Sequence, residues 1–410
     1  MIAVADLRPA VRNLTRNRKR ALAGLLTIAF GVIAMVLANG FIHWIFWAMR
    51  ESTIQSQLGH IQVVRPGYHE AGAADPFAYT LPPAVRERQA IEATPGVKIV
   101  APRLSVSGLI SFGETTVAFV ADAVDPEKEA ALKLAFGIVK GHDLSGPTTP
   151  EVIIGRGLAL NLGVSPGDTV SLLATTSSGG INAIEVKVAG IFITASKAYD
   201  DSALRLPLSL AHSLLRTQGA HVWLVLLEDT DQTDFFLAQF RARFPMQKTG
   251  LEFVPWYERA DFYNKTVTLF LQQMKVFQLI IGIIIVLSIT NMLTMNVLER
   301  TGEIGTLMAI GLKRSGVLKM FVTESLLLGL VGGVIGVAVG YGLAELISYV
   351  GIPMPPPPGM ERGYTGEILA TWPILSNAFL TALSTTVLAG LYPAWKASRL
   401  QIVDALRQNV

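Results

Sequence analysis

A run of 29 residues without Asp, Glu, Lys or Arg, Ala21–Met49, constrains the fold of this chain more than any other feature. As an α-helix it would be about 43 Å long, which exceeds the ~30 Å hydrocarbon core of a bilayer. The alternative is a cleaved signal peptide, whose apolar region is only about 7–15 residues long and is followed by a small-residue cleavage site. Phe41–Trp47 offers no such site, and Trp44 and Trp47 are typical of an interfacial aromatic belt. The run therefore predicts a retained membrane-spanning helix.

Three further apolar segments follow, and a long stretch of mixed composition separates them from the first. The segments are Val276–Leu298, Val317–Val350 and Ile368–Trp395, and about 220 residues lie between the first run and the second. Apolar residues make up 51% of the chain and charged residues only 16%, against about 25% in a typical soluble domain. This composition argues against a disordered chain and against a purely soluble enzyme. The predicted fold class is an α-helical membrane protein with four transmembrane helices.

The orientation follows from Lys and Arg, which are enriched in short cytoplasmic flanks of membrane helices. Basic residues gather before the first span, between the second and third spans, and after the fourth span. They are Arg8, Arg12, Arg16, Arg18, Lys19 and Arg20, then Arg300, Lys313 and Arg314, then Lys396, Arg399 and Arg407. The segment between the third and fourth spans carries only Arg362. Both termini are therefore predicted to be cytoplasmic and the large insert periplasmic, with a basic N-terminal helix on the inner leaflet.

These patterns divide the chain into consecutive parts. They are a cytoplasmic amphipathic N-terminal helix (1–20), transmembrane helix 1 (21–49), a periplasmic core domain (50–266), a stalk with transmembrane helix 2 (267–298), a cytoplasmic coupling loop (299–314), transmembrane helix 3 (315–350), a periplasmic Pro-rich loop (351–367), transmembrane helix 4 (368–395) and a cytoplasmic tail (396–410).

The insert between helices 1 and 2 alternates short strand and helix patterns, which predicts an α+β domain of two subdomains. It contains no His-Glu-x-x-His and no pair of His at metal-ligand spacing. The chain has no Cys, which excludes disulfides and thiolate metal sites. Asp200 and Asp201 beside Tyr199 could bind a cation, but a solvated turn is the favoured interpretation. We therefore expect no catalytic, cofactor-binding or metal-binding residues and interpret the insert as a binding or force-transmitting module.

A short segment directly after the second span, Glu299–Gly311, combines a charged start with an apolar face. Ile304, Leu307 and Met308 fall at helical spacing, while glycines within the segment lower its helix propensity by about 1 kcal/mol each relative to Ala. An amphipathic helix lying on the inner leaflet is one interpretation. A short cytoplasmic helix held by a partner protein is the favoured one, because the glycines allow close packing.

The third span carries a ladder of glycines spaced four residues apart. They are Gly329, Gly332, Gly333, Gly336 and Gly340. Small residues at this spacing let helices approach closely in lipid, either within one protomer or across a dimer. The same span holds Glu324, which we interpret as structural, snorkelling or pairing with Lys319, because the other spans lack the ionisable partners of a proton relay.

Several of these segments jointly resemble a known family. Glu299–Gly311, Glu324–Gly329 with its glycine ladder, and the ending Tyr392–Arg407 are similar to the C-terminal FtsX-type permease domain. The insert is similar to the MacB-type periplasmic core domain of lipoprotein-releasing and macrolide-efflux permeases. Ser56–Gln62 and Glu151–Ala159 resemble the lipoprotein-releasing LolC/LolE branch most, whereas the loop with Pro355–Pro358 departs from it.

The resemblance implies a separate cytoplasmic ABC ATPase that binds ATP and Mg, since this chain has no P-loop motif and is itself not an enzyme. It also implies a dimer with a second permease protomer, the same or a related chain. The coupling residues would be Glu299, Arg300 and Glu303, which orient the helix, and Ile304, Gly305 and Leu307, of which Ile304 and Leu307 pack into a groove of the ATPase. A substrate cleft between spans one and two of the two protomers would have apolar walls from Phe41, Trp44, Ile45, Leu271 and Met274, although lipid-facing packing is an alternative for each.

Two functions follow for a bacterial inner-membrane permease without a nucleic-acid partner. In the first, it extracts a lipid-anchored or amphiphilic substrate from the outer leaflet, with a periplasmic carrier as a further partner. In the second, it transmits force from ATP hydrolysis to a periplasmic partner, such as an efflux adaptor or a cell-wall hydrolase, and moves no substrate through the membrane.

Overall fold

The computed structural model describes residues 18–72, 74–82, 86–130, 137–194, 197–354 and 364–401. The predicted N-terminal amphipathic helix, the centre of the Pro-rich loop and the end of the C-terminal tail fall largely outside these residues. The chain divides into two compact units. The described residues of the helical unit fall within Met1–Trp47, Thr266–Pro353 and Thr365–Val410, and those of the sheet unit within Ala48–Lys265 and Met354–Tyr364.

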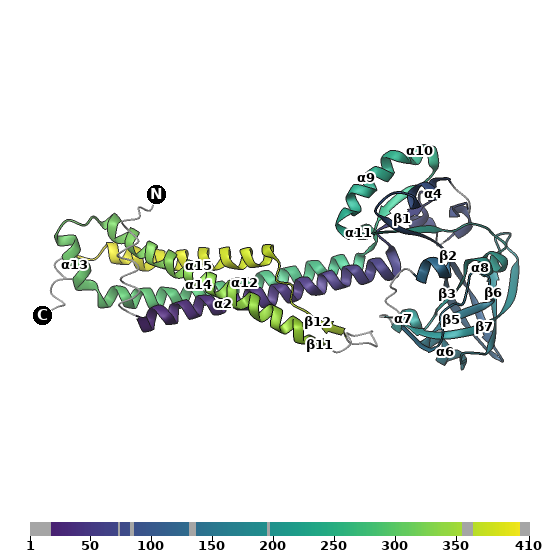
Figure 1. The fold of residues 1–410 in the computed structure, drawn as a ribbon, viewed down its shortest axis with the longest axis horizontal. Helices are drawn as coiled ribbons and strands as arrows, with labels where there is room; N and C mark the ends of the chain where they lie inside the picture. Colours follow the sequence, from purple (N-terminus) through teal and green to yellow (C-terminus); the bar gives the residue numbers. More distant parts are fainter. Residues whose placement is uncertain are drawn as a thin grey trace. The chain divides into compact units, whose positions relative to one another are not determined.

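The helical unit is built from four long helices, each long and apolar enough to cross a membrane. They are α2 (Arg18–Thr53), α12 (Asp261–Glu299), α14 (Arg314–Val350) and α15 (Trp372–Ser398), and Figure 1 shows them running beside one another. The first three continue past the ends of the apolar runs, because the flanking polar residues are also compatible with a helix. The fourth begins at Trp372, with Pro373 in its first turn, where the missing N–H costs nothing.

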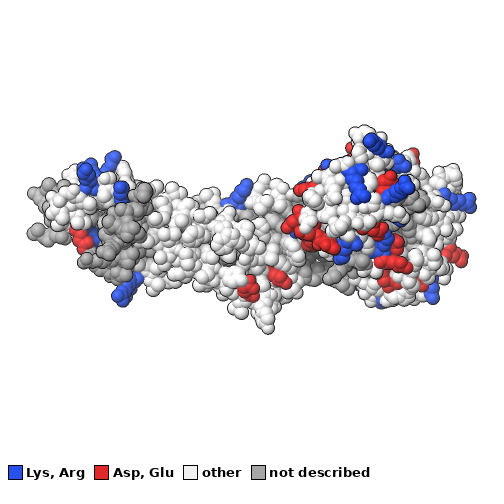
Figure 2. Space-filling view, turned by 45° about the horizontal axis from the view of Figure 1, so that its top comes forward, with Lys and Arg blue, Asp and Glu red and all other residues white. Residues whose placement is uncertain are grey.

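Side chains from all four helices form the core of the helical unit. The buried members are Ile28, Val32, Met35 and Val36 of α2, Ile285, Ile289 and Leu293 of α12, Leu328 of α14, and Leu375, Ala378, Ala382 and Ala389 of α15. A short helix, α13 (Thr301–Ala309), joins α12 to α14. Figure 2 shows a long middle stretch of this unit largely free of charged side chains. That distribution is expected of a surface that faces hydrocarbon.

The sheet unit contains ten strands joined in one hydrogen-bonded network among the described residues. They are β1 (Ile61–Val64), β2 (Val97–Phe112), β3 (Thr115–Val124), β4 (Gly137–Gly141), β5 (Glu151–Gly155), β6 (Thr169–Thr175), β7 (Ile181–Ile193), β8 (Ala203–Pro207), β9 (Val222–Leu227) and β10 (Glu252–Pro255). Their order is β10-β1-β9-β2-β3-β8-β5-β7-β4, and β6 pairs with β2 and β7. Most pairs are antiparallel, and β3–β8 and β5–β7 are parallel. Gly113, with φ +58°, turns β2 into β3 in a conformation that glycine adopts easily.

Short helices cover this network and divide its interior. They are α3 (Tyr68–Ala71), α4 (Arg86–Glu92), α5 (Pro126–Ala130), α6 (Arg156–Leu162), α7 (Lys197–Asp200), α8 (Leu208–Leu215), α9 (Thr233–Arg243), α10 (Met246–Thr249) and α11 (Trp256–Arg259), with a π-helical turn at Ile54–Leu58 and 3₁₀ turns at Pro76–Tyr79 and Thr230–Gln232. One apolar core lies where α6 and α8 contact β2, β3 and β5–β8. A second lies where α4 and α9 contact β1, β2, β9 and β10. The α+β prediction is therefore correct, and its two predicted subdomains correspond to two cores on one strand network.

A small two-stranded sheet lies on either side of the Pro-rich loop. Its strands are β11 (Ile352–Met354) and β12 (Tyr364–Gly366). The proline run Pro355–Pro358 between them is outside the described residues.

Candidate functional site

The short helix α13 lies where the resemblance places a coupling element. Its start is fixed locally, because Thr301 Oγ1 donates to the carbonyl oxygens of Val297 (3.1 Å) and Leu298 (2.9 Å) at the end of α12. Arg300 Nε donates to Glu303 Oε2 at 3.1 Å, which places a charged pair on the first turn. Two carbonyl oxygens at the end of α12 thus have hydrogen-bond partners from the first residue of α13.

The predicted coupling residue Glu299 has a partner that sequence analysis did not name. Both of its carboxylate oxygens accept hydrogen bonds from the guanidinium of Arg20, so the end of α12 is tied to the start of α2. Both side chains are about 40% exposed. A bidentate Arg–carboxylate pair fixes orientation more than a single contact does. Glu299 therefore aligns the adjoining ends of α2 and α12 rather than α13 alone.

The structure corrects the expectation for Ile304. Its side chain is 1% exposed and belongs to an apolar cluster within the helical unit, so it is not available to fill a groove of another protein. The other buried members of this coupling cluster are Val297, Met308, Val317, Phe321, Ala394 and Ala397. They come from α12, α13, α14 and α15. An amphipathic helix buries its apolar face against other apolar side chains. For α13 these side chains belong to α12, α14 and α15 of the same chain.

A different part of α13 is exposed on the surface of the helical unit. Glu303 and Thr306 are exposed, Leu307 is half-buried, and Gly305 is buried. Ile310, just past the end of the helix, is 78% exposed, although it was not a predicted site residue. The helical period could have flagged it, since it lies about 120° around the helix from Ile304. Gly311, with φ +108°, then redirects the chain towards α14.

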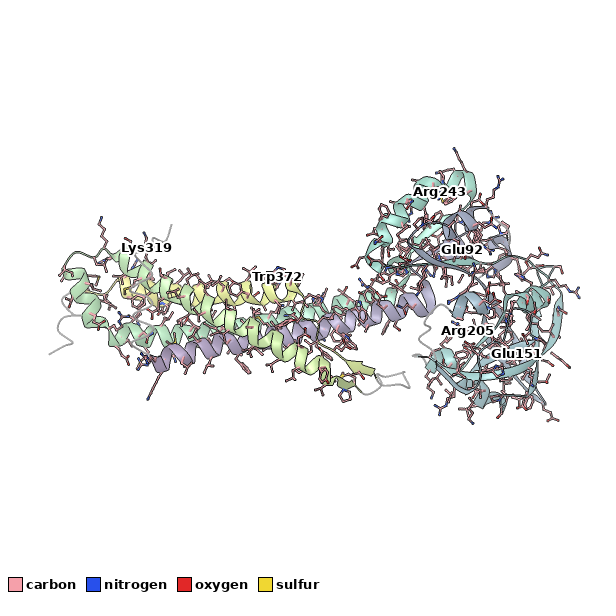
Figure 3. All side chains as sticks on the ribbon, viewed as in Figure 1. Glu92, Glu151, Arg205, Arg243, Lys319 and Trp372 are labelled. Atoms are coloured by element: carbon pink, nitrogen blue, oxygen red, sulfur yellow. The ribbon has the colours of Figure 1, made fainter. Side chains whose placement is uncertain are left out.

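Beneath α13, polar groups are buried in the helical unit. Glu324 is 2% exposed and Asn296 is 5% exposed, and neither Glu324 Oε2 nor Asn296 Oδ1 has a hydrogen-bond partner among the residues that the structure describes. Arg300, itself 8% exposed, acts electrostatically on Glu324. Lys319, the expected partner, is exposed and makes no ion pair with Glu324 among the described residues, and Figure 3 shows it towards the end of the unit that holds α13. The charge facing Glu324 therefore comes from the coupling segment and not from its own helix.

The glycine ladder of α14 faces two different helices. A Cβ added to Gly332, Gly336 or Gly340 would meet Ile28, Val32 or Val36 of α2, at 2.6–3.3 Å. A Cβ added to Gly329 or Gly333 would instead meet side chains of α15, at 2.8–3.0 Å. The two rows thus let α14 approach both neighbours within one protomer.

The predicted cleft residues occupy different environments in this chain. Trp44 and Met274 are buried, at 7% and 8% exposure, while Phe41 and Ile45 are half-buried and Leu271 is exposed. A Cβ on Gly366 would lie 3.0 Å from the Phe41 ring, so Phe41 packs beside the β12 segment. A cleft shared by two protomers stays a prediction. Within the chain, a cavity opens on another side of α12, between α12 and α15.

The sheet unit shows no group of three or more potential metal ligands among the described residues. Asp200 is buried and its carboxylate accepts hydrogen bonds from the backbone N–H and the hydroxyl of Thr194, at 2.7–3.1 Å. It therefore closes a turn and does not face a cation in solvent. Glu129 is likewise enclosed, because it binds Arg103 (2.8 and 3.0 Å) and Arg205 (3.2 Å) in the interior.

Three histidines of the sheet unit are held neutral by burial. Burial lowers the pKa of His60, His69 and His221 to about 4 in each case. At His60 the nearby charge of Arg50 adds to the effect of burial. None of these three imidazoles has a carboxylate as hydrogen-bond partner among the described residues.

Comparison with known sequences agrees with this architecture. Residues 22–243 match the family described as MacB-like periplasmic core domain, and residues 275–402 match the FtsX-like permease C-terminal family. Because the first match alone covers more than half of the chain, the chain belongs to the MacB-like, FtsX-type permease family. The first match extends from α2 through α9, and the second extends from within α12 to the end of α15.

Individual relatives share shorter segments. The chain is 36% identical over 119 residues to the uncharacterized ABC transporter permease YvrN of Bacillus subtilis (strain 168), which is 29% of this chain and 26% of that protein. It is 38% identical over 150 residues to the macrolide export ATP-binding/permease protein MacB of Brucella abortus (strain 2308), 36% of this chain and 20% of that protein. For the pyoverdine export ATP-binding/permease protein PvdT of Pseudomonas syringae pv. syringae (strain B728a) the identity is 38% over 145 residues, 35% of this chain and 19% of that protein. The chain thus matches only about a fifth to a quarter of the length of these relatives.

Two solved structures resemble the chain at low identity. The extracellular domain of the transporter YknZ from Gram-positive bacteria covers 48% of this chain and 98% of its own, with 16% identity and a TM-score of 0.36. The periplasmic region of MacB from Actinobacillus actinomycetemcomitans covers 51% and 93%, with 12% identity and a TM-score of 0.36.

Proposed function

We propose that this chain is the permease subunit of an ATP-driven ABC transporter whose ATPase is a separate cytoplasmic protein. The observation that carries the proposal is the coupling cluster, in which the buried Ile304 and Met308 of α13 contact the ends of membrane helices. A force applied to α13 therefore acts on α12, α14 and α15 through close-packed side chains, which transmit displacement because interiors compress little. The Arg20–Glu299 pair extends the same connection to α2.

In this proposal the ATPase contacts the exposed side of α13 and its end. Glu303 and Thr306 supply the polar contacts, and Leu307 with Ile310 supplies apolar area. ATP and Mg would be bound by the ATPase, and a second permease protomer would complete the assembly. Glu299 and Arg300 act within the chain, by aligning α2 and α12 and by anchoring the start of α13.

A charge reversal at Glu303 tests the coupling role. We expect Glu303→Lys to lower stimulation of the ATPase by the permease at least about fivefold, the lower range of typical coupling energies. The measurement is ATP hydrolysis by the purified complex in lipid, beside the thermal unfolding of the permease alone. Glu367→Lys, the same reversal at another exposed position, is the matched control. Unchanged stimulation in Glu303→Lys would show that α13 only lies on lipid.

For the transported species, we propose a lipid-anchored or amphiphilic substrate that is extracted from the outer leaflet. Support comes from the exposed apolar side chains of α12, which would contact an amphiphile better than a polar solute. The second candidate is force transmission to a periplasmic partner without transport. It is favoured by the sheet unit, whose described residues hold no metal cluster and which projects an 80%-exposed Ile181 beside the β6–β7 turn.

Mass spectrometry of proteins and lipids that co-purify from native membranes in mild detergent separates the two. An ATPase together with lipoproteins or another amphiphile supports extraction. An ATPase with a periplasmic adaptor or hydrolase, and no amphiphile, supports force transmission. If no ATPase accompanies the chain, the permease proposal itself is wrong.

A further inference from the structure

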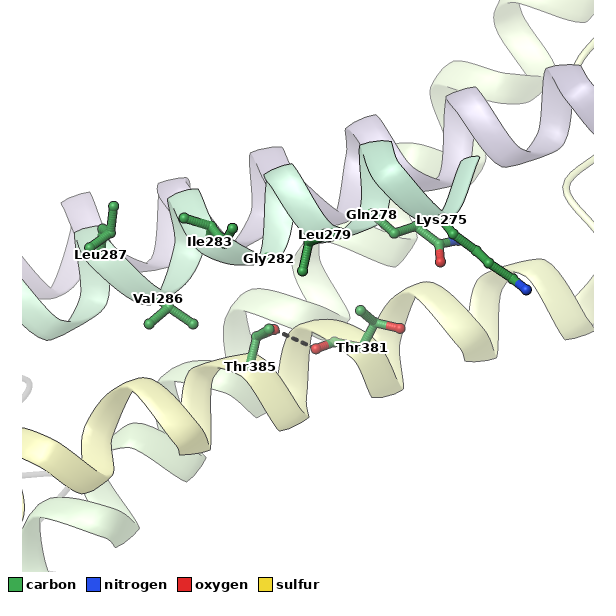
Figure 4. A pocket seen from close by; sticks show the side chains of 9 residues that line it. All are labelled: Lys275, Gln278, Leu279, Gly282, Ile283, Val286, Leu287, Thr381 and Thr385. Atoms are coloured by element: carbon green, nitrogen blue, oxygen red, sulfur yellow. Dashed lines mark hydrogen bonds between the residues drawn. The ribbon is translucent and has the colours of Figure 1, made fainter. Parts of the chain in front are cut away.

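A cavity of about 510 Å³ lies between α12 and α15 in the helical unit. Its lining residues are Lys275, Gln278, Leu279, Gly282, Ile283, Val286 and Leu287 of α12 with Thr381 and Thr385 of α15. Figure 4 shows Lys275 and Gln278 at one end of this α12–α15 groove and Leu287 at the other. From Lys275 to Leu287 the groove follows about 18 Å of helix. That length is close to the ~15 Å of a single leaflet, half of a ~30 Å hydrocarbon core.

The walls of the groove are apolar although two threonines contribute to them. Thr385 Oγ1 donates to the carbonyl oxygens of Thr381 and Ala382 of its own helix, the latter at 3.1 Å, and the first bond is drawn in Figure 4. Its methyl group therefore faces α12, and a Cβ on Gly282 would lie 3.4 Å from it. On the α12 side Leu279, Ile283 and Leu287 are 63%, 49% and 66% exposed. A chain of methylene groups fits this surface.

The charged end of the groove gives it a direction. Lys275 is the residue directly before the uncharged run Val276–Leu298, so it lies at the membrane boundary that is next to the sheet unit along the chain. Lys275 is exposed, and no ion pair to it occurs among the described residues. Gln278, one turn further in, donates to Asn39 Oδ1 at 3.3 Å, which joins α12 to α2 at this level. The ammonium group of Lys275 thus lies at one end of an apolar groove.

We propose that the α12–α15 groove binds one anionic phospholipid of the leaflet on the sheet-unit side, with an acyl chain along Leu279–Leu287 and its phosphate at Lys275. A transmembrane helix of a second copy is a poorer occupant. Close helix contacts in lipid need rows of small residues, and the small residues here, Gly282 and Thr385, already face each other. The site is independent of the proposed transport function, since it needs neither ATP nor a substrate.

The absence of Cys allows a direct test with single labelled positions. A small environment-sensitive fluorophore is attached to Ile283→Cys in the groove, and the full chain is placed in phosphatidylethanolamine vesicles. Brominated phosphatidylglycerol or brominated phosphatidylethanolamine is then added as quencher. We expect the anionic lipid to quench at about fivefold lower concentration, the effect of one basic residue on an anionic lipid. Ile284→Cys is the matched control, because it is the next residue along the helix, is 55% exposed and does not line the groove.

The preference for phosphatidylglycerol at Ile283→Cys should disappear when Lys275→Gln is added. Equal quenching by both lipids at both labels would overturn the site, and so would a preference that survives Lys275→Gln. Quenching by neither lipid at Ile283→Cys would show that protein, such as a second copy, covers the groove. A label-free measurement uses phosphatidylglycerol that co-purifies with the chain, which Lys275→Gln should reduce and Lys265→Gln, an exposed lysine earlier on α12, should not.

Discussion

At the scale of single residues, the buried His60 makes the stability of the sheet unit depend on pH. Its Nδ1 accepts the backbone N–H of Leu227 at 3.0 Å, and its Nε2 lies 2.9 Å from Thr230 Oγ1. Nδ1 therefore has no room for a proton, and Nε2 carries the hydrogen and donates it. Burial and the charge of Arg50 lower its pKa to about 4, against about 6.5 in an unfolded chain. Between these values the unfolded state binds more protons, so stability falls as the pH is lowered through this window.

We expect His60→Gln to reduce the acid sensitivity of the sheet unit. The amide oxygen of Gln can still accept from Leu227, but it does not titrate. Protonation of His60 lowers the free energy of unfolding by at most about 3 kcal/mol between pH 6.5 and pH 4. His69 and His221 contribute further losses of the same kind. Urea unfolding of the sheet unit in the full chain, followed by pulse proteolysis at several pH values, measures the loss. A pH profile of His60→Gln equal to that of the unsubstituted chain would contradict the argument.

Two isoleucines of the coupling segment separate stability from function. Ile304→Ala removes a buried side chain from the coupling cluster and should lower the free energy of unfolding by about 2–5 kcal/mol. Ile310→Ala removes an exposed one and should leave thermal unfolding unchanged while it weakens ATPase stimulation. Thermal unfolding in detergent and ATP hydrolysis are measured on both variants. A destabilised Ile310→Ala would place this side chain inside the unit and argue against its role as a contact.

The sequence predicted the apolar face of α13 but not what covers it. Helical spacing groups Ile304 with Leu307 and Met308, and it carries no information on whether the partner is foreign or belongs to the chain. The partners, Phe321 and Ala394, are distant in sequence, and only the packing of α14 against α15 brings them together. The Arg20–Glu299 pair was missed for the same reason, since its members are 279 residues apart.

At the scale of elements, the glycine spacing of α14 likewise predicts a contact but not the identity of the partner. The four-residue repeat predicts close helix contacts, and the structure has them on two sides. Which side meets α2 and which meets α15 depends on how the helices are arranged, and a period alone does not encode it. The order of strands in the sheet was unpredictable for the same reason. β1 pairs with β9 and β10, whose residues lie more than 150 positions later in the sequence.

Two glycines of the same helix test this contact. A Cβ at Gly336 would lie 2.6 Å from Val32 Cβ and 2.9 Å from the Ala29 carbonyl oxygen, whereas at Gly342 nothing lies within 4 Å. Gly336→Ala should therefore destabilise the helical unit by about 1–3 kcal/mol through overpacking against the backbone of α2. Gly342→Ala should be neutral or slightly stabilising, because alanine favours the helix. Thermal unfolding in detergent compares the two, and equal effects would mean that α2 and α14 separate easily.

At the scale of the whole molecule, composition determines what could be predicted from sequence. Four apolar runs must be helices if they lie in hydrocarbon, since their backbone groups have no other partners there. The existence and order of the helices were therefore predictable. Their ends were less so: α2 begins at Arg18 and extends to Thr53, beyond the predicted 21–49, because nothing in the chain stops the helix at the membrane boundary.

The distribution of Lys and Arg makes a further prediction about the whole molecule, the side of the membrane on which each unit lies. Positive residues flank the helices at the α13 end, and the positive-inside rule places that end in the cytoplasm. In the Cys-free chain, Ser178→Cys at the exposed β6–β7 turn should react with a membrane-impermeant maleimide in intact spheroplasts. Ser315→Cys, exposed at the start of α14, should react only after the membrane is permeabilised. The reverse pattern would place the sheet unit in the cytoplasm. The groove at Lys275 would then lie in the inner leaflet, because that membrane boundary would face the cytoplasm.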